Sequence, residues 1–265
     1  MDRVLITGCS SGIGRASAVE LTKRGFEVIA TARRPETLDD LDVAEKLRLD
    51  VTDDASIAEA KSKAGRVDVL INNAGFGVGG PIEKVPVTEV QRLYDTNVFG
   101  CVRMIQAFVP QMRERGSGTI VNISSVAGRT SSPLGGYYSS SKFALEAICE
   151  ALHYETRHFG IRTILIEPGA FASSINENSP EPYGVDDAPY DELAKIWEEA
   201  QGRLGTGESP PSEVAAQFIA DAIESDDLKL RWPIGDDAKL IVDTRDSMSF
   251  EQFEAAMRSV LQLDW

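Results

Sequence analysis

A tyrosine and a lysine stand four residues apart in the chain, at Tyr138 and Lys142. In a helix, this spacing places both side chains on the same face. A phenol has a pKa of about 10, but a neighbouring ammonium group favours the phenolate and lowers that pKa. We therefore predict that the pair exchanges a proton with an alcohol or a carbonyl near pH 7. The alternative is a surface pair without chemistry, because this spacing is common by chance.

Two further polar side chains are candidates for the same chemistry. Ser125 follows the apolar run Thr119–Ile123 and precedes Tyr138 by 13 residues. Its hydroxyl could hold a substrate oxygen; Ser124 is the alternative, and either serine could simply cap a strand end. Asn97 lies in an otherwise apolar helical stretch. A buried amide needs partners, so it has either a structural role or a place in a proton relay through an ordered water.

A glycine-rich turn lies between the first predicted strand and the first predicted helix. It reads Thr7-Gly8-Cys9-Ser10-Ser11-Gly12-Ile13-Gly14. Glycines let a phosphate approach backbone N–H groups, and the helix N-terminus adds a partial positive charge. The GxxxGxG spacing alone would also suit a structural turn. Its position directly after the first strand predicts a phosphate-binding site.

The ends of the next two predicted strands indicate which dinucleotide would bind. At the end of the second strand, an acidic residue would accept the ribose hydroxyls of NAD, but Arg33 and Arg34 stand there instead. Arginines pair with a 2′-phosphate, so we predict NADP(H), with Arg33 as the main candidate. NAD(H) is the alternative if both arginines are solvated. Asp50, which precedes Val51, could accept from the adenine amino group or serve as a cap or turn carboxylate.

Seven short β-rich runs alternate with helical stretches and must position these side chains. The expected strands are Arg3–Thr7, Glu27–Ala32, Lys46–Asp50, Val67–Asn72, Thr119–Ser124, Arg162–Glu167 and Lys229–Pro233. The main expected helices are Gly14–Arg24, Ala55–Ala64, Val90–Arg113 and Tyr138–Phe159. The first six runs are apolar with little alternation, as in strands covered on both faces. This predicts an α/β fold with a doubly wound, mostly parallel sheet that binds its ligand beyond the carboxyl ends of the strands.

The composition is that of an ordinary globular protein, with 42% hydrophobic and 26% charged residues. We interpret residues 1–265 as a single domain. The net charge of −15 argues against a nucleic-acid or anionic-membrane surface. No apolar run approaches the roughly 20 residues of a membrane span, and the N-terminus lacks the apolar segment of a signal peptide. The three cysteines have no metal-binding spacing, so we expect a reduced, cytoplasmic protein without a metal site.

The charge is unevenly spread along the chain. Residues 1–171 carry 20 basic and 21 acidic side chains, whereas residues 172–265 carry 7 basic and 21 acidic ones. We therefore expect the first part to hold any anionic ligand. Residues 172–211 contain five prolines and interrupt the alternation of strands and helices. We interpret them as a substrate-binding lid with a helix near Tyr190–Arg203; a plain surface insertion is the alternative.

These motifs together resemble the short-chain dehydrogenase/reductase family. The matching segments are TGCSSGIG (7–14), LDVTD (49–53), NNAG (72–75), YDTNVFG (94–100), NISS (122–125), YSSSK (138–142) and EPGAF (167–171). They follow the family's order and cover about residues 3–175. The spacings are similar to those of its compact oxidoreductase branch. The TARRPE turn and the run from Phe76 to Gly100 resemble 17β-hydroxysteroid and retinol dehydrogenases.

The resemblance implies a seven-stranded Rossmann fold and reversible hydride transfer between a nicotinamide and a ketone or secondary alcohol. It makes Tyr138 the general acid/base and gives Ser125 the substrate oxygen. Lys142 would bind the nicotinamide ribose and lower the pKa of Tyr138, and Asn97 would hold a water. The implied cofactor-binding residues are Gly8, Ser10, Ser11, Gly12, Ile13, Gly14, Arg33, Arg34, Asp50, Val51, Asn73, Ala74, Gly75, Tyr138, Lys142, Pro168, Gly169, Phe171 and Ser173. Ser173 stands where the family often has threonine.

Two expectations concern partners. The acidic lid makes a polyanionic substrate unfavourable, so we expect a neutral, apolar one that is steroid-, retinoid- or aryl-ketone-like. The candidate pocket residues, which could equally belong to the core, are Phe76, Val78, Leu134, Phe171, Tyr183 and Trp197. The helices Val90–Arg113 and Tyr138–Phe159 carry apolar residues on more than one face. They predict a homodimer or homotetramer, as the resemblance also implies, unless the C-terminal segment covers them.

Overall fold

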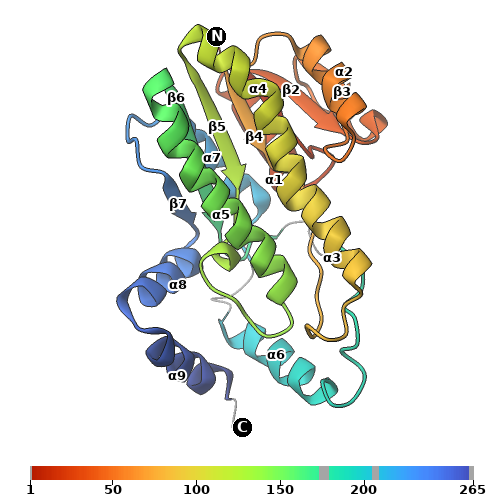
Figure 1. The fold of residues 1–265 in the computed structure, drawn as a ribbon, viewed down its shortest axis with the longest axis vertical. Helices are drawn as coiled ribbons and strands as arrows, with labels where there is room; N and C mark the ends of the chain where they lie inside the picture. The colour runs from red at the N-terminus through yellow and green to blue at the C-terminus, as the bar shows by residue number, and fades with distance from the viewer. Residues whose placement is uncertain (1, 173–178, 205–208, 263–265) are drawn as a thin grey trace.

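The computed structural model describes residues 2–172, 179–204 and 209–262. Seven strands form one sheet in the order β3-β2-β1-β4-β5-β6-β7, and all neighbouring strands are parallel (Figure 1). The strands are β1 Arg3–Ile6, β2 Glu27–Ala32, β3 Glu45–Arg48, β4 Val69–Asn72, β5 Gly118–Ile123, β6 Ile161–Pro168 and β7 Arg231–Ile234. The predicted fold class is therefore confirmed, with strand boundaries that shift by one or two residues at most ends.

Helices connect the strands and cover the sheet. They are α1 Gly12–Lys23, α2 Asp54–Ala64, α3 Val87–Tyr94, α4 Cys101–Arg115, α5 Gly136–Thr156, α6 Asp191–Leu204, α7 Ser212–Glu224, α8 Asp236–Ser247 and α9 Phe250–Leu261. The predicted helix Val90–Arg113 is α3 and α4, joined by a π-helical turn at Asp95–Gly100. A π turn inserts a residue into the helical ladder and often marks a functional site. Asn97 lies within it.

The core consists of two apolar layers, one on each face of the sheet. Helices α1 and α7 contribute to one layer, for example with Leu21 and Ile219. Helices α2, α4 and α5 contribute to the other, and α4 and α5 run side by side across the sheet (Figure 1). Successive residues of a strand point to opposite faces, so Leu5 and Ile6 lie in different layers. This is why the strands show little alternation of apolar and polar residues.

Beyond the carboxyl ends of the strands lie α6, α8 and α9 (Figure 1). Helix α6 confirms the helix expected near Tyr190–Arg203. The two ends of the 172–211 segment meet, because Ala172 and Pro211 form a bridge and the Ala172 N–H donates to the Pro210 carbonyl over 2.8 Å. The segment therefore leaves the sheet and returns to one point at its carboxyl edge. Within the described part of the chain, no helix has the length and apolar character that a membrane crossing requires.

Candidate active site

A cavity of about 740 Å³ lies at the carboxyl ends of the strands. Its size suits a small organic ligand. The predicted site residues on its wall are Gly8, Ser10, Ser11, Gly12, Ile13, Arg33, Asp50, Val51, Asn73, Ala74, Gly75, Ser125, Tyr138, Lys142, Pro168, Gly169 and Phe171. The structure thus brings together the glycine turn, the arginine at the end of β2 and the Ser125, Tyr138 and Lys142 side chains.

The glycine turn lies close against the end of β4. Gly8 has a φ of +75°, and a Cβ there would lie 2.9 Å from Ala74 Cα. The Asn73 side chain donates to the carbonyls of Thr7 and Gly8 over 2.9 and 3.1 Å. The first turn of α1 carries no acidic residue, so its partial positive charge is available to an anion. This close approach of backbone and helix N-terminus suits a phosphate.

Gly14 does not line the cavity, contrary to the prediction. It is buried in α1, where an added Cβ would lie 2.3 Å from the Asn73 amide nitrogen and 2.5 Å from the Gly8 carbonyl oxygen. Gly14 therefore provides the space in which Asn73 ties β4 to the glycine turn. Its contribution to the site is indirect.

The arginine end of the cavity contains Arg33 and Asp50. Arg33 is exposed and lines the wall. Arg34 does not line it but precedes a short 3-10 helix, and its carbonyl accepts a hydrogen bond from the Thr37 hydroxyl over 2.7 Å. Burial by itself would raise the pKa of Asp50, but hydrogen bonds from Thr52 and the charge of Arg33 lower it below its ordinary value. Asp50 is therefore an anion at neutral pH.

Tyr138 and Ser125 meet at the other end of the cavity. Burial raises the pKa of Tyr138 to about 12, while a hydrogen bond with Ser125 acts in the opposite direction. The Ser125 hydroxyl accepts from the Ala127 N–H over 3.1 Å and donates to the Pro168 carbonyl over 3.5 Å. Ser125 therefore both caps a short 3-10 helix and reaches the phenol. Ser124 also lines the cavity, but its buried hydroxyl has no hydrogen-bond partner among the residues that the structure describes.

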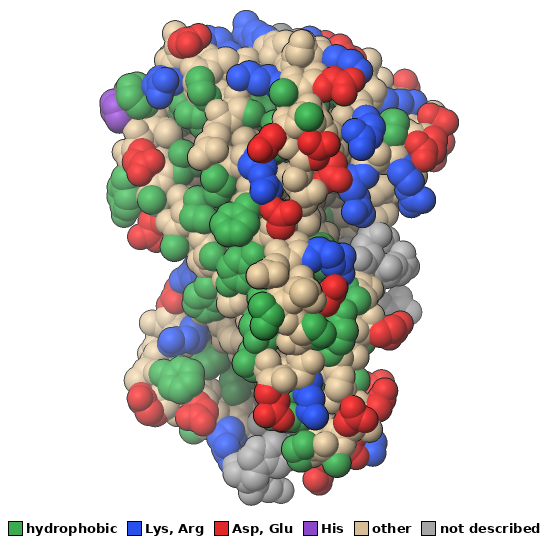
Figure 2. Space-filling view, turned by 45° about the vertical axis from the view of Figure 1, so that its right-hand side comes forward, with side chains coloured by type: hydrophobic (Ala, Val, Ile, Leu, Met, Phe, Trp, Pro, Cys, Tyr) green, Lys and Arg blue, Asp and Glu red, His purple; other side chains and the backbone are tan. Residues whose placement is uncertain are grey.

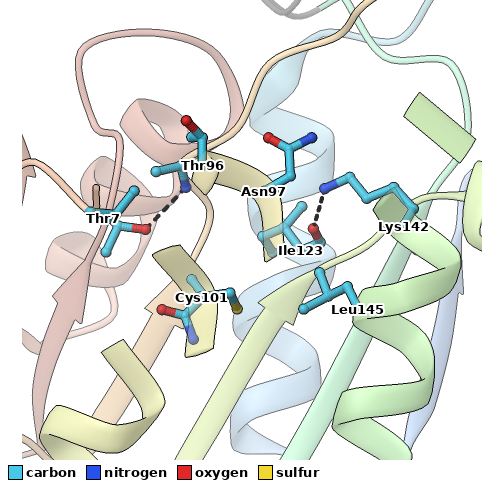
Figure 3. A pocket seen from close by; sticks show the side chains of 10 residues that line it. Thr7, Thr96, Asn97, Cys101, Ile123, Lys142 and Leu145 are labelled. Carbon is cyan, nitrogen blue, oxygen red and sulfur yellow. Dashed lines mark hydrogen bonds between the residues drawn. The ribbon is translucent and has the colours of Figure 1, made fainter. Parts of the chain in front are cut away.

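Lys142 is 7% exposed, and its ammonium group donates to the Ile123 carbonyl over 2.8 Å (Figure 3). Burial lowers the pKa of Lys142 to about 8. Its Nζ lies 5.7 Å from the centre of the Tyr138 ring, so both groups are on the same side of α5. The prediction that Lys142 lowers the pKa of Tyr138 is nevertheless not met in this structure. Burial dominates both groups, and the ammonium points to a backbone carbonyl instead of the phenol.

Asn97 lies behind the cavity wall. Its amide accepts from the Phe76 N–H over 3.1 Å and donates to the Phe76 carbonyl over 2.9 Å. It therefore fixes the backbone at the start of the loop that follows β4. A second cavity of about 10 Å³ is lined by both Asn97 and Lys142 (Figure 3). A cavity of this size is about the smallest that can hold one water molecule. The predicted water therefore stays a prediction, with a suitable place.

Sequence reasoning missed several residues of the cavity wall. They are Ala32, Leu49, Thr52, Gly77, Arg92, Asp95, Thr96, Ile123, Ala170 and Ser209. Most of them adjoin a predicted strand end or lie within one of the matched motifs, and these were the available signals for them. Arg92 comes from α3, and Asp95 comes from the π turn, within the YDTNVFG motif.

The predicted substrate-pocket residues separate into two groups. Phe76 and Phe171 line the cavity. Val78 and Tyr183 instead pack in a small apolar cluster with Leu93, and Leu134 and Trp197 are not on the cavity wall. Ser173 lies outside the described residues. Among the residues that the structure describes, no three His, Cys, Asp or Glu side chains gather as metal ligands would.

Comparisons with known proteins agree with this geometry. A family model described as short chain dehydrogenase matches residues 2–184. The chain belongs to the short-chain dehydrogenase/reductase family. It is 36% identical to an uncharacterized oxidoreductase, YusZ, of Bacillus subtilis, over 97% of each chain. It is 43% identical to human 17-beta-hydroxysteroid dehydrogenase type 1, over 67% of this chain and 60% of that protein.

A solved short-chain dehydrogenase from Streptomyces avermitilis has the same architecture. Its TM-score to this chain is 0.84 at 38% identity, and 97% of each chain is covered. The family membership makes this protein an oxidoreductase that acts on alcohol and ketone groups. Family membership does not by itself determine its substrate or its choice between NADP(H) and NAD(H).

Proposed function

We propose that this short-chain dehydrogenase/reductase is NADP(H)-dependent and transfers a hydride reversibly between the nicotinamide and a neutral, apolar ketone or secondary alcohol. One observation carries the proposal: Ser125, Tyr138 and Lys142 converge at one end of a cavity whose other end bears Arg33. Reacting groups and a phosphate-pairing cation thus share one continuous space. Such a cavity suits a long ligand with an anionic end and a reactive end.

The residues of the cavity fit a dinucleotide. The N-terminus of α1 and the close approach at Gly8 favour its pyrophosphate. Asp50 and Val51 would flank the adenine, and Asn73 would lie near the adjoining ribose. Arg33 is exposed on the wall, where its guanidinium would pair with a 2′-phosphate by charge-assisted hydrogen bonds. This choice of NADP(H) over NAD(H) rests on Arg33.

The proposed mechanism assigns one role to each side chain. A reduced nicotinamide, when bound, supplies a hydride to the carbonyl carbon. The Ser125 hydroxyl holds the carbonyl oxygen, and Tyr138 gives that oxygen a proton, so the product is a neutral alcohol. In the reverse direction Tyr138 accepts the proton. Lys142, which lines the same end of the cavity, would bind the nicotinamide ribose.

The substrate end of the cavity is lined by Phe76 and Phe171, which suit an apolar molecule. The segment 172–211 carries 9 acidic and 2 basic residues, so it would repel a polyanion. Two contacts support its role as a lid. Ser209 lines the cavity, and the Gly77 N–H donates to the Ser179 hydroxyl over 2.7 Å. The relative 17-beta-hydroxysteroid dehydrogenase type 1 is named for a substrate of this apolar kind.

Association of subunits through α4 and α5 is part of the proposal. Phe99 is 52% exposed, Phe143 45% and Tyr154 73%, all on these helices or the π turn before them. Figure 2 shows apolar side chains gathered across the middle of one face, with charged side chains above and below. Exposed apolar patches of this kind mark protein interfaces. Light scattering of the purified protein would test for a dimer or tetramer.

A pair of matched substrate series would test the proposed activity. NADPH oxidation would be followed with apolar ketones and with their carboxylated counterparts, and alcohol oxidation with NADP⁺. We expect turnover of the apolar ketones, slower turnover of the carboxylates, and tighter binding of NADPH than of NADH in fluorescence titrations. Preferential turnover of the carboxylates would contradict the substrate class. Equal affinity for the two cofactors would contradict the role of Arg33.

A further inference from the structure

A short segment, residues 168–171, forms part of the cavity wall. Helix α8 begins near it, although the helix itself does not line the cavity. The second residue of α8 is Asp237, and its carboxylate accepts a hydrogen bond from the Ala170 N–H over 2.6 Å. An acidic side chain in the first turn of a helix is also stabilised by the helix dipole. Asp237 therefore binds the backbone of the cavity wall without lining the cavity itself.

The position of the Asp237 carboxylate leaves no room for a side chain at residue 169. A Cβ added at Gly169 would lie 2.1 and 2.3 Å from the two carboxylate oxygens of Asp237. Gly169 has no positive φ, so the backbone conformation does not demand glycine there. Glycine is required there by the lack of space, because the Asp237 carboxylate occupies the place that a side chain would take. The position of Asp237 and the absence of a side chain at Gly169 thus depend on each other.

The corner between β7 and α8 binds the same segment at a second N–H group. The Gly169 N–H donates to the Ile234 carbonyl over 3.1 Å. Gly235 has a φ of +95°, and a Cβ there would lie 2.8 Å from the Asp237 carboxylate and 3.4 Å from the Phe171 ring. Two consecutive N–H groups of the segment are therefore bound by this corner. The Phe171 ring, which lines the cavity, lies directly against it.

The segment also contacts the reacting groups. The Ser125 hydroxyl donates to the Pro168 carbonyl over 3.5 Å, and Ser125 in turn hydrogen-bonds Tyr138. A shift of the segment would therefore redirect the serine hydroxyl as well as move the wall. The residue that sets the position of this segment consequently affects both the binding of a ligand and its alignment.

We propose that Asp237 is a positioning residue: it fixes segment 168–171 at the distance from Ser125 and Tyr138 that cofactor binding and hydride transfer require. This inference rests on the proposed function, which places the nicotinamide against Pro168 and Gly169. It extends the site to α8, in the acidic C-terminal part of the chain. Asp237 itself touches neither the substrate nor the cofactor.

The test compares Asp237→Ala with Asp236→Ala in the full-length protein. Asp236 is the neighbouring acidic residue in the same helical turn and is exposed, so its removal changes the charge and the helix dipole equally. A hydrogen bond to a charged group is worth roughly a 10- to 100-fold change in an equilibrium. We expect Asp237→Ala to weaken NADPH binding about 10-fold or more in fluorescence titrations. Asp236→Ala should stay within about 2-fold of the wild type.

Three further variants separate positioning from general destabilisation. Asp237→Asn keeps an acceptor for the Ala170 N–H, so it should recover most of the NADPH affinity. Gly169→Ala alone should lose affinity because its Cβ meets the carboxylate. The double variant Gly169→Ala with Asp237→Ala should lose less than the two single losses combined, since the obstructing group is gone. The thermal unfolding midpoint of each variant would be measured alongside.

The outcomes are distinguishable from those that test the proposed function. If the wild type binds neither NADPH nor NADH, the proposed function is wrong, and the positioning role that rests on it is overturned with it. If the wild type binds NADPH and reduces a ketone, three results each overturn the positioning role. They are unchanged affinity in Asp237→Ala, an equal loss in Asp236→Ala, and strictly additive losses in the double variant.

Discussion

The part of the chain up to Phe171 and the part from Ala172 onward differ in charge and in how they contribute to the site. The first part is nearly neutral, with 20 basic and 21 acidic side chains, and supplies six of the seven strands. The second carries 7 basic and 21 acidic side chains and supplies β7 and four helices among its described residues. Of the second part, only Ser209 lines the cavity within the described chain. The reacting groups therefore belong to one part, and most of the acidic excess belongs to the other.

The two parts hold their side chains in different ways. In the first, polar side chains of the site bind backbone groups at strand ends, as Lys142 binds the Ile123 carbonyl and Asn97 binds Phe76. The regular spacing of a parallel sheet thus determines where the chemistry lies. The second part joins the first through the apolar face of α7 and the pairing of β7 with β6, and in addition through charge at the surface. Arg24 pairs with Asp221 at 2.7 Å, and Arg129 pairs with Asp246 at 2.7 Å. Basic side chains of the first part thus neutralise some of the acidic excess of the second.

The most severe test of this division is removal of the Tyr138 hydroxyl. Because the reacting groups belong to the first part, Tyr138→Phe should lower kcat by about 10³-fold, the scale of general acid catalysis. Its NADPH dissociation constant should change by less than about 3-fold. Steady-state kinetics and fluorescence titration would measure the two effects. Tyr137→Phe is the matched control, because the Tyr137 hydroxyl binds the Ile82 carbonyl and should be dispensable. Turnover retained by Tyr138→Phe would refute the acid/base assignment.

A second prediction concerns Glu167, which lies where the two parts join. This carboxyl is fully buried, 3.1 Å from Arg129 of the first part and 3.6 Å from Arg231 of the second. Burial, with a smaller effect of the Glu146 charge, raises the pKa of Glu167 from 4.5 to about 7. Between these pH values the folded state keeps a proton that the unfolded state releases. The contribution of Glu167 to the free energy of unfolding therefore falls as pH rises from about 4.5 to about 7, by at most about 3 kcal/mol.

Glu167→Gln should remove this pH dependence. Denaturant unfolding at pH 5, 6, 7 and 8 would show a wild-type-minus-variant difference that declines up to pH 7 and then levels off. Glu150→Gln is the control, because the hydrogen bond from Arg231 lowers the pKa of half-buried Glu150, the opposite direction. A constant difference between wild type and Glu167→Gln across this range would show that Glu167 is ionised throughout.

The extent to which sequence anticipates the structure also differs along the chain. The sheet and the strand-end residues are predictable because two-sided burial and the glycine turn leave local patterns, as at Leu5 and Gly8. The roles of Gly14 and Asp237 are not predictable from the sequence. Gly14 lies against Asn73 and Asp237 binds Ala170, and these partners are distant in sequence and meet only in the folded chain. The sequence also did not predict that the Lys142 ammonium group is buried and donates to a backbone carbonyl. A spacing of four residues places it beside Tyr138 but does not show that burial governs both groups.

A third prediction sharpens the comparison within the first part. Arg33 lines the cavity and Arg34 does not, although they are neighbours. Because a charge-assisted pair with a phosphate is worth roughly 1.5–3 kcal/mol, Arg33→Ala should weaken NADPH binding about 10- to 100-fold. NADH, which lacks the 2′-phosphate, should be affected less than about 3-fold, and Arg34→Ala should change either affinity little. Fluorescence titrations of both cofactors would measure this, and an equal loss for NADPH and NADH in Arg33→Ala would refute the phosphate role.

The smallest expected effect tests whether the second part governs substrate binding separately from chemistry. The Tyr183 hydroxyl of the 172–211 segment hydrogen-bonds Glu89 of α3. Glu89 also pairs with Arg92 at 2.7 Å, and the Arg92 guanidinium lies 4.4 Å from the centre of the Phe76 ring on the cavity wall. Tyr183→Phe should loosen this chain of contacts without reaching Ser125 or Tyr138. We expect KM for an apolar ketone to rise about 2- to 3-fold, since an exposed hydrogen bond contributes little.

The matched control is Tyr190→Phe, because Tyr190 hydrogen-bonds Glu83, which is not on the cavity wall. Steady-state kinetics of both variants, with NADPH saturating, would separate KM from kcat. A rise in KM in Tyr183→Phe alone means that the segment acts on the substrate through α3 and Phe76. A fall in kcat with unchanged KM would mean that the acidic part also aligns the reacting groups. The second part would then align the reacting groups through Tyr183 as well as through Asp237, and a separate effect of Tyr183 on substrate binding would be refuted.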